Sequence, residues 1–147
     1  MTQPFRLQAL LDYRRQLEDE QMRALAEVTV EEQRVRDTIT ALDRHSEEQT
    51  AALAALVAGG TFDAEGYTQR AAYLDAIGLA LDQQAAALEV AAARVRERRE
   101  ALVEALKDRR VLERLRDRQA EEAAVEDGRH EARGVDDMMM TRHQRTP

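Results

Sequence analysis

The chain has 147 residues, of which 35% are charged and 3% are aromatic, and its formal net charge is −7 at pH 7. This composition is typical of long helices and coiled coils and supplies few large side chains for a globular core. The negative charge argues against general nucleic-acid binding, and the absence of Cys excludes disulfides and thiolate metal sites.

The first predicted element is a helix over about residues 5–57. Pro4 suits a first helical turn, and apolar side chains then recur at alternating steps of three and four residues, the spacing of a coiled-coil seam with heptad positions a to g. Leu10 and Leu17 fall one position before this seam, so we expect a shifted register in the first turns. The seam positions a and d hold Leu7, Leu11, Leu25, Val28, Val35, Ile39, Leu42, Leu53 and Leu56.

A turn is predicted over about residues 58–63. Gly59-Gly60 ends the first helix, because glycine tolerates the left-handed conformation found just past a helix C-terminus. Asp63 is the expected N-cap of the second helix. Phe62 and Tyr67 then have the spacing of a hydrophobic staple, which fixes the angle at which the chain enters the helix.

The second predicted helix covers about residues 64–126, and its a and d positions include Leu74, Ile77, Leu81, Leu88, Val95, Leu102 and Leu112. Folding back at the turn places Leu42 near Leu81 and Leu11 near Leu112. The predicted fold is therefore all-α, an antiparallel coiled-coil hairpin over 1–127 in which helix two is the longer. Beyond it we expect a frayed polar tail over 128–147, which contains Met138-Met139-Met140. This tail is expected to be disordered unless a partner binds it.

The sequence carries no sign of catalytic chemistry. Gly59-Gly60 lacks the Lys-Ser/Thr of a phosphate-binding loop, and the three His have no metal-ligand spacing. No stretch approaches the ~20 apolar residues of a membrane span, and the first residues do not read as a signal peptide. We expect no enzyme, no catalytic, cofactor or metal site, and no membrane insertion.

Two segments resemble a known family. Residues 5–18, FRLQALLDYRRQLE, resemble the start of the flagellar FliJ family, which often begins Phe-x-Leu-x-x-Leu-Leu and continues with Arg residues and an acidic-rich helix. LRDRQ at 115–119, followed by Glu126 and a polar tail with Asp136-Asp137, resembles its C-terminal part. The single turn and the aromatic start of helix two, Tyr67 and Tyr73, also match. These are small coiled-coil proteins of the bacterial flagellar type III export apparatus.

The resemblance implies a stalk whose two terminal segments enter a hexameric export ATPase and stimulate it, linking it to a membrane export-gate protein and handling export chaperones. It implies a cytoplasmic location at the flagellar base, peripheral to the inner face of the cell membrane. The candidate residues for ring binding are Leu7, Leu10, Leu11, Tyr13, Leu112, Leu115, Arg118 and Gln119. The candidates for gate binding are Leu42, His45, Gln49, Tyr67 and Leu74, of which His45 and Gln49 depart from the aromatic residues common in the family.

Other readings stay open on the sequence. Heptads alone also fit a structural adaptor that is a parallel homodimer, in which the glycine pair is only an interruption. Apolar stripes also fit a chaperone that holds unfolded export cargo. The sequence does not distinguish a flagellar export system from a related virulence secretion system that has an equivalent stalk. The turn chemistry favours a hairpin that is monomeric when free.

Overall fold

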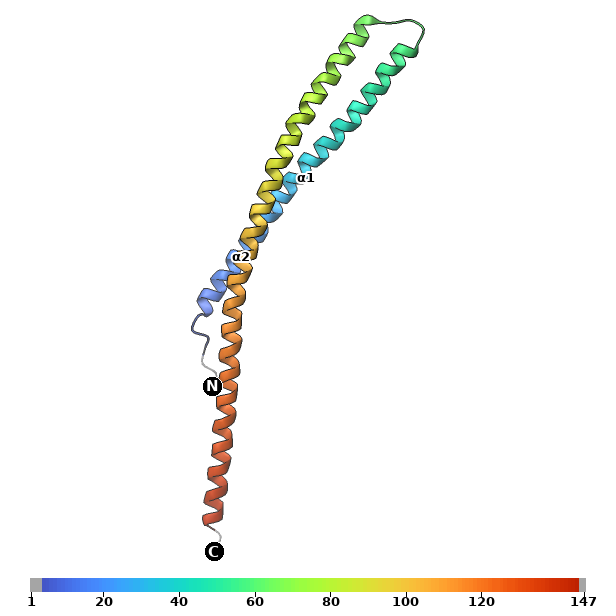
Figure 1. Ribbon diagram of the computed structural model, residues 1–147. Coiled ribbons are helices and arrows are strands. Elements are labelled where there is room, and N and C mark those ends of the chain that lie inside the picture. Colours follow the sequence, from blue (N-terminus) through green and yellow to red (C-terminus); the bar gives the residue numbers. More distant parts are fainter. Residues whose placement is uncertain (1–3, 146–147) are drawn as a thin grey trace. The chain divides into compact units, whose positions relative to one another are not determined.

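The computed structural model describes residues 4–145 as two α-helices, α1 from Gln8 to Ala58 and α2 from Ala64 to Gln144 (Figure 1). Residues 1–3 of the predicted hairpin and 146–147 of the predicted tail lie outside this description. Within 4–145 there is no strand, as the all-α prediction requires. Neither helix contains a segment apolar enough to cross a membrane, over the residues described.

The chain divides into two compact units, and both helices contribute to each. Unit 1 comprises Met1–Glu20 with Val103–Pro147, and unit 2 comprises Gln21–Leu102. In unit 2, Glu31 pairs with Arg94 and Gln49 with Arg70. Residue numbers rise along α1 as they fall along α2, so the helices are antiparallel, and in unit 1 the pairs Arg15–Glu113 and Glu18–Arg109 run the same way. The predicted antiparallel hairpin is confirmed.

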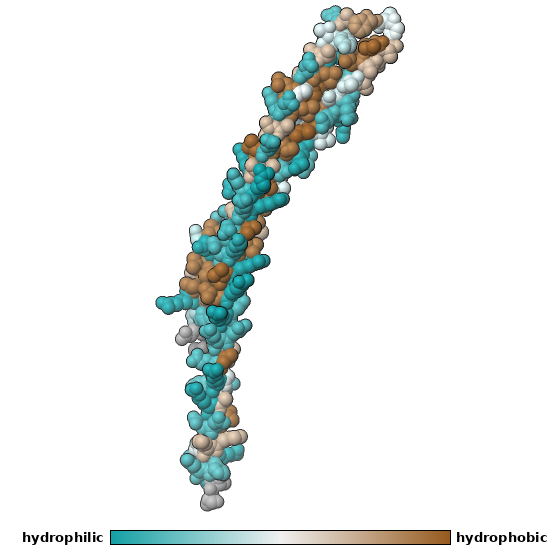
Figure 2. All heavy atoms as spheres, in the orientation of Figure 1, coloured by the Kyte–Doolittle hydropathy of each residue, from teal (hydrophilic) through white to brown (hydrophobic). Residues whose placement is uncertain are grey.

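Burial follows the predicted heptad frame. The buried residues of α2 are Ile77, Ala91, Val95 and Leu112, and each occupies an a or d position. In α1, Leu11 is 0% exposed whereas its neighbour Leu10 is 39% exposed. The predicted shift of register in the first turns is therefore wrong, because the same seam that faces α2 farther along α1 continues to Leu11. Apolar side chains gather along both helices of unit 2 and again beside the start of α1 in unit 1 (Figure 2).

The turn between the helices is built by local chemistry. Gly60 has φ of +30°, the left-handed region. The backbone N–H of Gly66 donates to Asp63 Oδ1 at 3.1 Å, which is the N-cap geometry predicted for Asp63. The rings of Phe62 and Tyr67 have centroids 5.7 Å apart, as the predicted staple requires. A Cβ on Gly66 would lie 2.6 Å from Asp63 Oδ2, so glycine leaves room for the cap.

Replacing Asp63 with Ala is expected to lower the free energy of unfolding by about 1 kcal/mol, because the first turn of α2 loses the acceptor for an otherwise unsatisfied N–H. Urea unfolding followed by circular dichroism measures this loss. Asp82→Ala is the matched control, since Asp82 is an exposed carboxylate in the middle of α2. An equal loss in both variants would contradict a capping role.

The second helix is longer than the sequence indicated. A helix end near residue 126 and a frayed tail over 128–147 were expected, but α2 continues to Gln144. The seam pattern stops because the segment past the start of α1 has no facing helix, and every residue from Ala124 to Arg145 is exposed. Arg and Met, which have high intrinsic helix propensity, are nevertheless among the commonest residues of the segment. Gly128 and Gly134 lower that propensity without interrupting the helix.

Candidate binding surfaces

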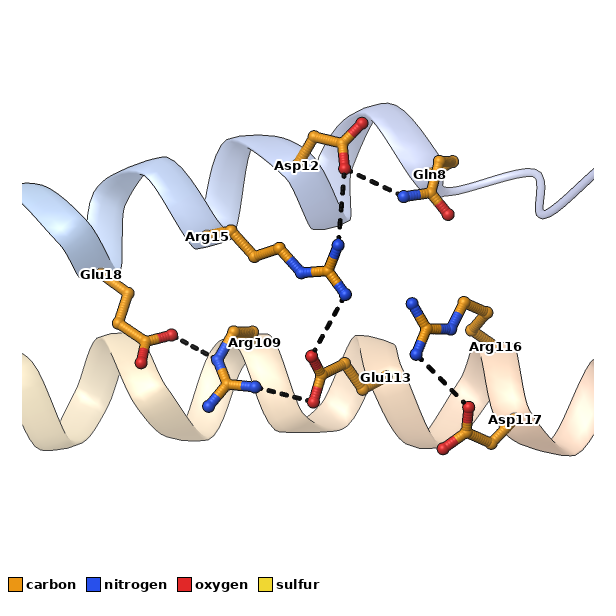
Figure 3. Close-up of polar contacts among 8 residues, drawn as sticks. All are labelled: Gln8, Asp12, Arg15, Glu18, Arg109, Glu113, Arg116 and Asp117. Carbon is orange, nitrogen blue, oxygen red and sulfur yellow. Dashed lines mark hydrogen bonds and ion pairs between the residues drawn. The ribbon is translucent and has the colours of Figure 1, made fainter.

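A chain of charged side chains crosses between the two helices of unit 1 (Figure 3). Arg109 on α2 donates to Glu113 Oε2 at 2.7 Å and also to Glu18 of α1. Arg15 of α1 lies 3.3 Å from Glu113 and 3.9 Å from Asp12. Glu18 and Arg109 both occupy heptad position a, so an ion pair joins the helices at two seam positions that usually hold apolar side chains. Such a polar pair fixes the register of two helices.

The same contacts shift the ionisation of two groups. The hydrogen bond from Arg109, helped by that from Arg15, holds the pKa of the Glu113 carboxyl below its ordinary value, and burial opposes this only in part. Hydrogen bonds to Glu113 and Glu18 raise the pKa of Arg109. Because the folded-state pKa of Glu113 is the lower one, ionised Glu113 stabilises the fold above the unfolded-state pKa of about 4.3. That contribution is lost as the pH falls through the folded-state pKa.

The thermal midpoint of the wild type is therefore expected to fall more steeply below about pH 4.3 than that of Glu113→Gln, which carries no titrating group at this position. Above that pH the wild type is expected to be the more stable of the two. Glu104→Gln is the control, because Glu104 pairs only with Lys107 on the exposed face of the same helix. Thermal unfolding at a series of pH values measures all three proteins. Parallel curves for the wild type and Glu113→Gln would contradict the assignment.

All eight candidate residues for ring binding lie in unit 1, on the first turns of α1 and on the part of α2 beside them. Leu11 and Leu112 are buried in the seam and hold the two helices together, and their assignment to ring binding stays a prediction. The exposed candidates are Leu7, Leu10, Tyr13, Leu115 and Arg118, while Gln119 is half-buried.

Four of the five exposed candidates of unit 1 lie on one side of the hairpin, and the fifth, Leu7, occupies seam position d. Leu10 and Leu115 both occupy position g, and antiparallel pairing brings the g positions of the two helices to the same side. Tyr13 and Arg118 occupy position c, the next position outward on that side. A groove adjoins this region, bordered by Phe5 and Gln8 and by α2 residues between Arg116 and Arg133. We name Leu10, Tyr13 and Leu115 the g-side patch.

The candidates for gate binding all lie in unit 2, and most take part in contacts within the hairpin. His45 meets Tyr73 edge to face, with ring centroids 5.3 Å apart and an interplanar angle of 89°. Gln49 accepts a hydrogen bond from Arg70 at 3.2 Å, and Leu42 and Leu74 are half-buried. Tyr67 packs on Phe62 in the staple. Tyr73 was not among the candidates, although its g position opposite the g position of His45 was a signal that could have found it.

The comparisons with known proteins decide the family. Residues 2–147 match the family described as Flagellar FliJ protein. The chain belongs to the FliJ family. The resemblance predicted from residues 5–18 and 115–119 is thereby confirmed, and this FliJ-family protein is a component of the type III export apparatus.

A solved structure supports the fold of this FliJ-family protein. The chain is similar to the solved structure of a putative YscO homolog from Chlamydia trachomatis, with a TM-score of 0.60 and 20% sequence identity. The match covers 98% of this chain and 96% of the YscO homolog. At this identity the likeness concerns the fold alone, two long helices in a hairpin. Among curated proteins, no sequence matches the chain.

Proposed function

We propose that this FliJ-family protein is a non-catalytic stalk of the flagellar export apparatus. Unit 1 binds a hexameric export ATPase and stimulates it, and the turn end of unit 2 contacts a membrane export-gate protein. Export chaperones are further partners. The protein acts in the cytoplasm, at the inner face of the membrane where the flagellum is assembled, and the free chain is a monomer.

The g-side patch carries this proposal. Two leucines and a tyrosine are exposed on one side of a narrow hairpin, next to the buried pair Leu11 and Leu112. Apolar side chains that cluster on a surface mark contacts with another protein, because covering them removes apolar area from water. The patch lies in unit 1, which contains both terminal segments of the chain, and the family resemblance sends these segments into the ring.

The mechanism follows from the shape of the two partners. A single rod inside a six-fold ring cannot contact all subunits alike, since the hairpin has one apolar side. Each subunit in turn therefore meets the g-side patch, and the rod favours the conformation of the subunit that it touches. A ligand that binds one conformation more tightly shifts the population toward it. Stimulation needs no catalytic residue from the stalk.

ATP hydrolysis by the export ATPase of the same organism, with and without the purified protein, tests the proposal. Stimulation is expected to saturate well below one chain per ATPase subunit, because one rod serves one ring. Sedimentation of the free protein measures its oligomeric state alongside. Absence of both stimulation and binding would leave a structural adaptor without an ATPase partner as the better reading.

The gate contact is proposed for the residues near the turn that keep exposed surface. Tyr67 and its staple partner Phe62 are exposed, and His45 borders a shallow groove on α1 with Leu42 and Glu48. Gln49 is half-buried and bonded to Arg70, so it supports the geometry of this end.

A further inference from the structure

The outward face of α2 in unit 2 carries a second apolar stripe with coiled-coil spacing. Its members follow one another at steps of four, three, four, three, four and three residues, on the side of α2 opposite the seam. Its two large apolar side chains, Leu79 and Val90, are 61% and 55% exposed. The stripe comprises Ala72, Ala76, Leu79, Gln83, Ala86, Val90 and Ala93, and we name it the outer stripe.

The outer stripe differs from the outward positions that directly follow it along α2. Positions c and f of α1 carry charged side chains at seven of 15 places, among them Glu27, Arg34 and Asp37. The same positions of α2 are charged from Glu97 to Glu121 except at Val111, and they are uncharged again from Val125 to Met139. Charged side chains are what a solvated helix face normally presents. The run of about three heptads without charge over 72–93 is therefore a feature that coiled-coil architecture alone does not require.

An acidic column borders the outer stripe. Asp75, Asp82 and Glu89 follow at seven-residue steps, and they are the only charged residues of α2 between Arg70 and Arg94. All three are exposed and none forms an ion pair within the described part of the chain. The opposite border is held by Tyr73, Ala80 and Ala87. In coiled coils, charges at such flanking positions select the partner helix.

A second copy of the chain fits this surface poorly. Antiparallel pairing of two outer stripes would place the two acidic columns against each other, which is repulsive. Parallel pairing would set Asp75 and Asp82 opposite the uncharged Ala80 and Ala87, and only Glu89 would meet an Arg, Arg94. The charges therefore favour a different helix, one with basic side chains along the facing flank.

We propose that the outer stripe binds an amphipathic helix of another protein, with an apolar heptad stripe and a column of Lys or Arg along one flank. The small side chains of the stripe allow the helix axes to approach closely, while Leu79 and Val90 insert between residues of the partner. The basic column pairs with Asp75, Asp82 and Glu89 and sets the register. This interaction goes beyond the proposed function and uses none of the residues assigned to the ring or the gate.

Two synthetic four-heptad peptides test the proposal by titration calorimetry against the full-length protein. Both carry Leu and Ala at positions a and d; one has Lys at every e and g position and the other has Glu. The Lys peptide is expected to bind roughly tenfold more tightly than the Glu peptide. Leu79→Gln with Val90→Gln is expected to weaken it by roughly tenfold, whereas Val30→Gln, an exposed valine on α1, leaves binding unchanged.

Charge reversal separates the acidic column from general attraction to an acidic protein. Asp75→Lys, Asp82→Lys and Glu89→Lys together are expected to reverse the preference between the peptides. The matched set Glu27→Lys, Asp43→Lys and Glu47→Lys changes the net charge equally on α1 and is expected to keep the preference. Equal effects of the two sets, unchanged binding by the Leu79/Val90 variant, or no binding of either peptide would overturn the proposal. So would a dimer of the wild type that the Leu79/Val90 variant abolishes.

Discussion

Leu11→Ala is expected to lower the free energy of unfolding by about 2–5 kcal/mol, the range for truncating a buried leucine. Leu11 is the one large side chain with no exposure within the described residues. It fills the seam between α1 and α2 in unit 1. The next position a along α1 holds Glu18, which pairs with Arg109. Few apolar contacts are available there to compensate for the cavity.

The control for Leu11 is its neighbour. Leu10→Ala removes the same atoms from a side chain that is 39% exposed, so its cost is expected to be under about 1 kcal/mol. Hydrogen exchange resolved by residue shows whether the loss is local to unit 1, where α1 residues 8–20 should exchange faster. Equal destabilisation by the two variants would mean that the seam does not extend to Leu11 in solution.

Replacing the g-side patch with acidic residues is expected to weaken ATPase stimulation without unfolding the hairpin. Leu10→Asp, Tyr13→Asp and Leu115→Asp change three side chains that are already exposed, so helix content should stay close to that of the wild type. Binding of an apolar patch to a protein partner depends on a few central side chains. We expect the concentration for half-maximal stimulation to rise by roughly tenfold or more.

A matched triple variant guards against a general charge effect. Met22→Asp, Val30→Asp and Val57→Asp also place three carboxylates at exposed apolar positions, but in unit 2. This variant is expected to stimulate the ATPase as the wild type does. If the unit 2 variant lost stimulation and the unit 1 variant kept it, the two ends of the proposed stalk would have to be exchanged.

Leu7 and Leu11 are also candidates for ring binding, but the double variant Leu7→Asp with Leu11→Asp is a poorer test. Leu11 is buried, so a carboxylate there would disrupt the seam, and lost stimulation would then report unfolding. Exposure cannot be seen in a run such as Leu10-Leu11, where both residues have the same chemistry. It depends on which side of α1 faces α2, and the packing of Leu11 in the seam decides this.

The sequence by itself determined the elements of the hairpin and the family. Spacing of apolar residues at three and four positions defined both helices, since only a period near 3.5 keeps one side of a helix against its partner. The glycine pair, Asp63 and the pair Phe62–Tyr67 determined the turn, because caps and staples depend on residues close in sequence.

Tertiary structure decided the features that depend on distant residues. The pairing of Glu18 with Arg109 joins two polar seam positions in an ion pair that fixes the register, and neither residue reveals this alone. The helical state of 128–144 overrode the decay of the heptad pattern, because a helix can persist on propensity where no partner covers it. Which candidate residues are exposed was likewise decided by packing, since burial is a property of two facing helices and not of either sequence segment.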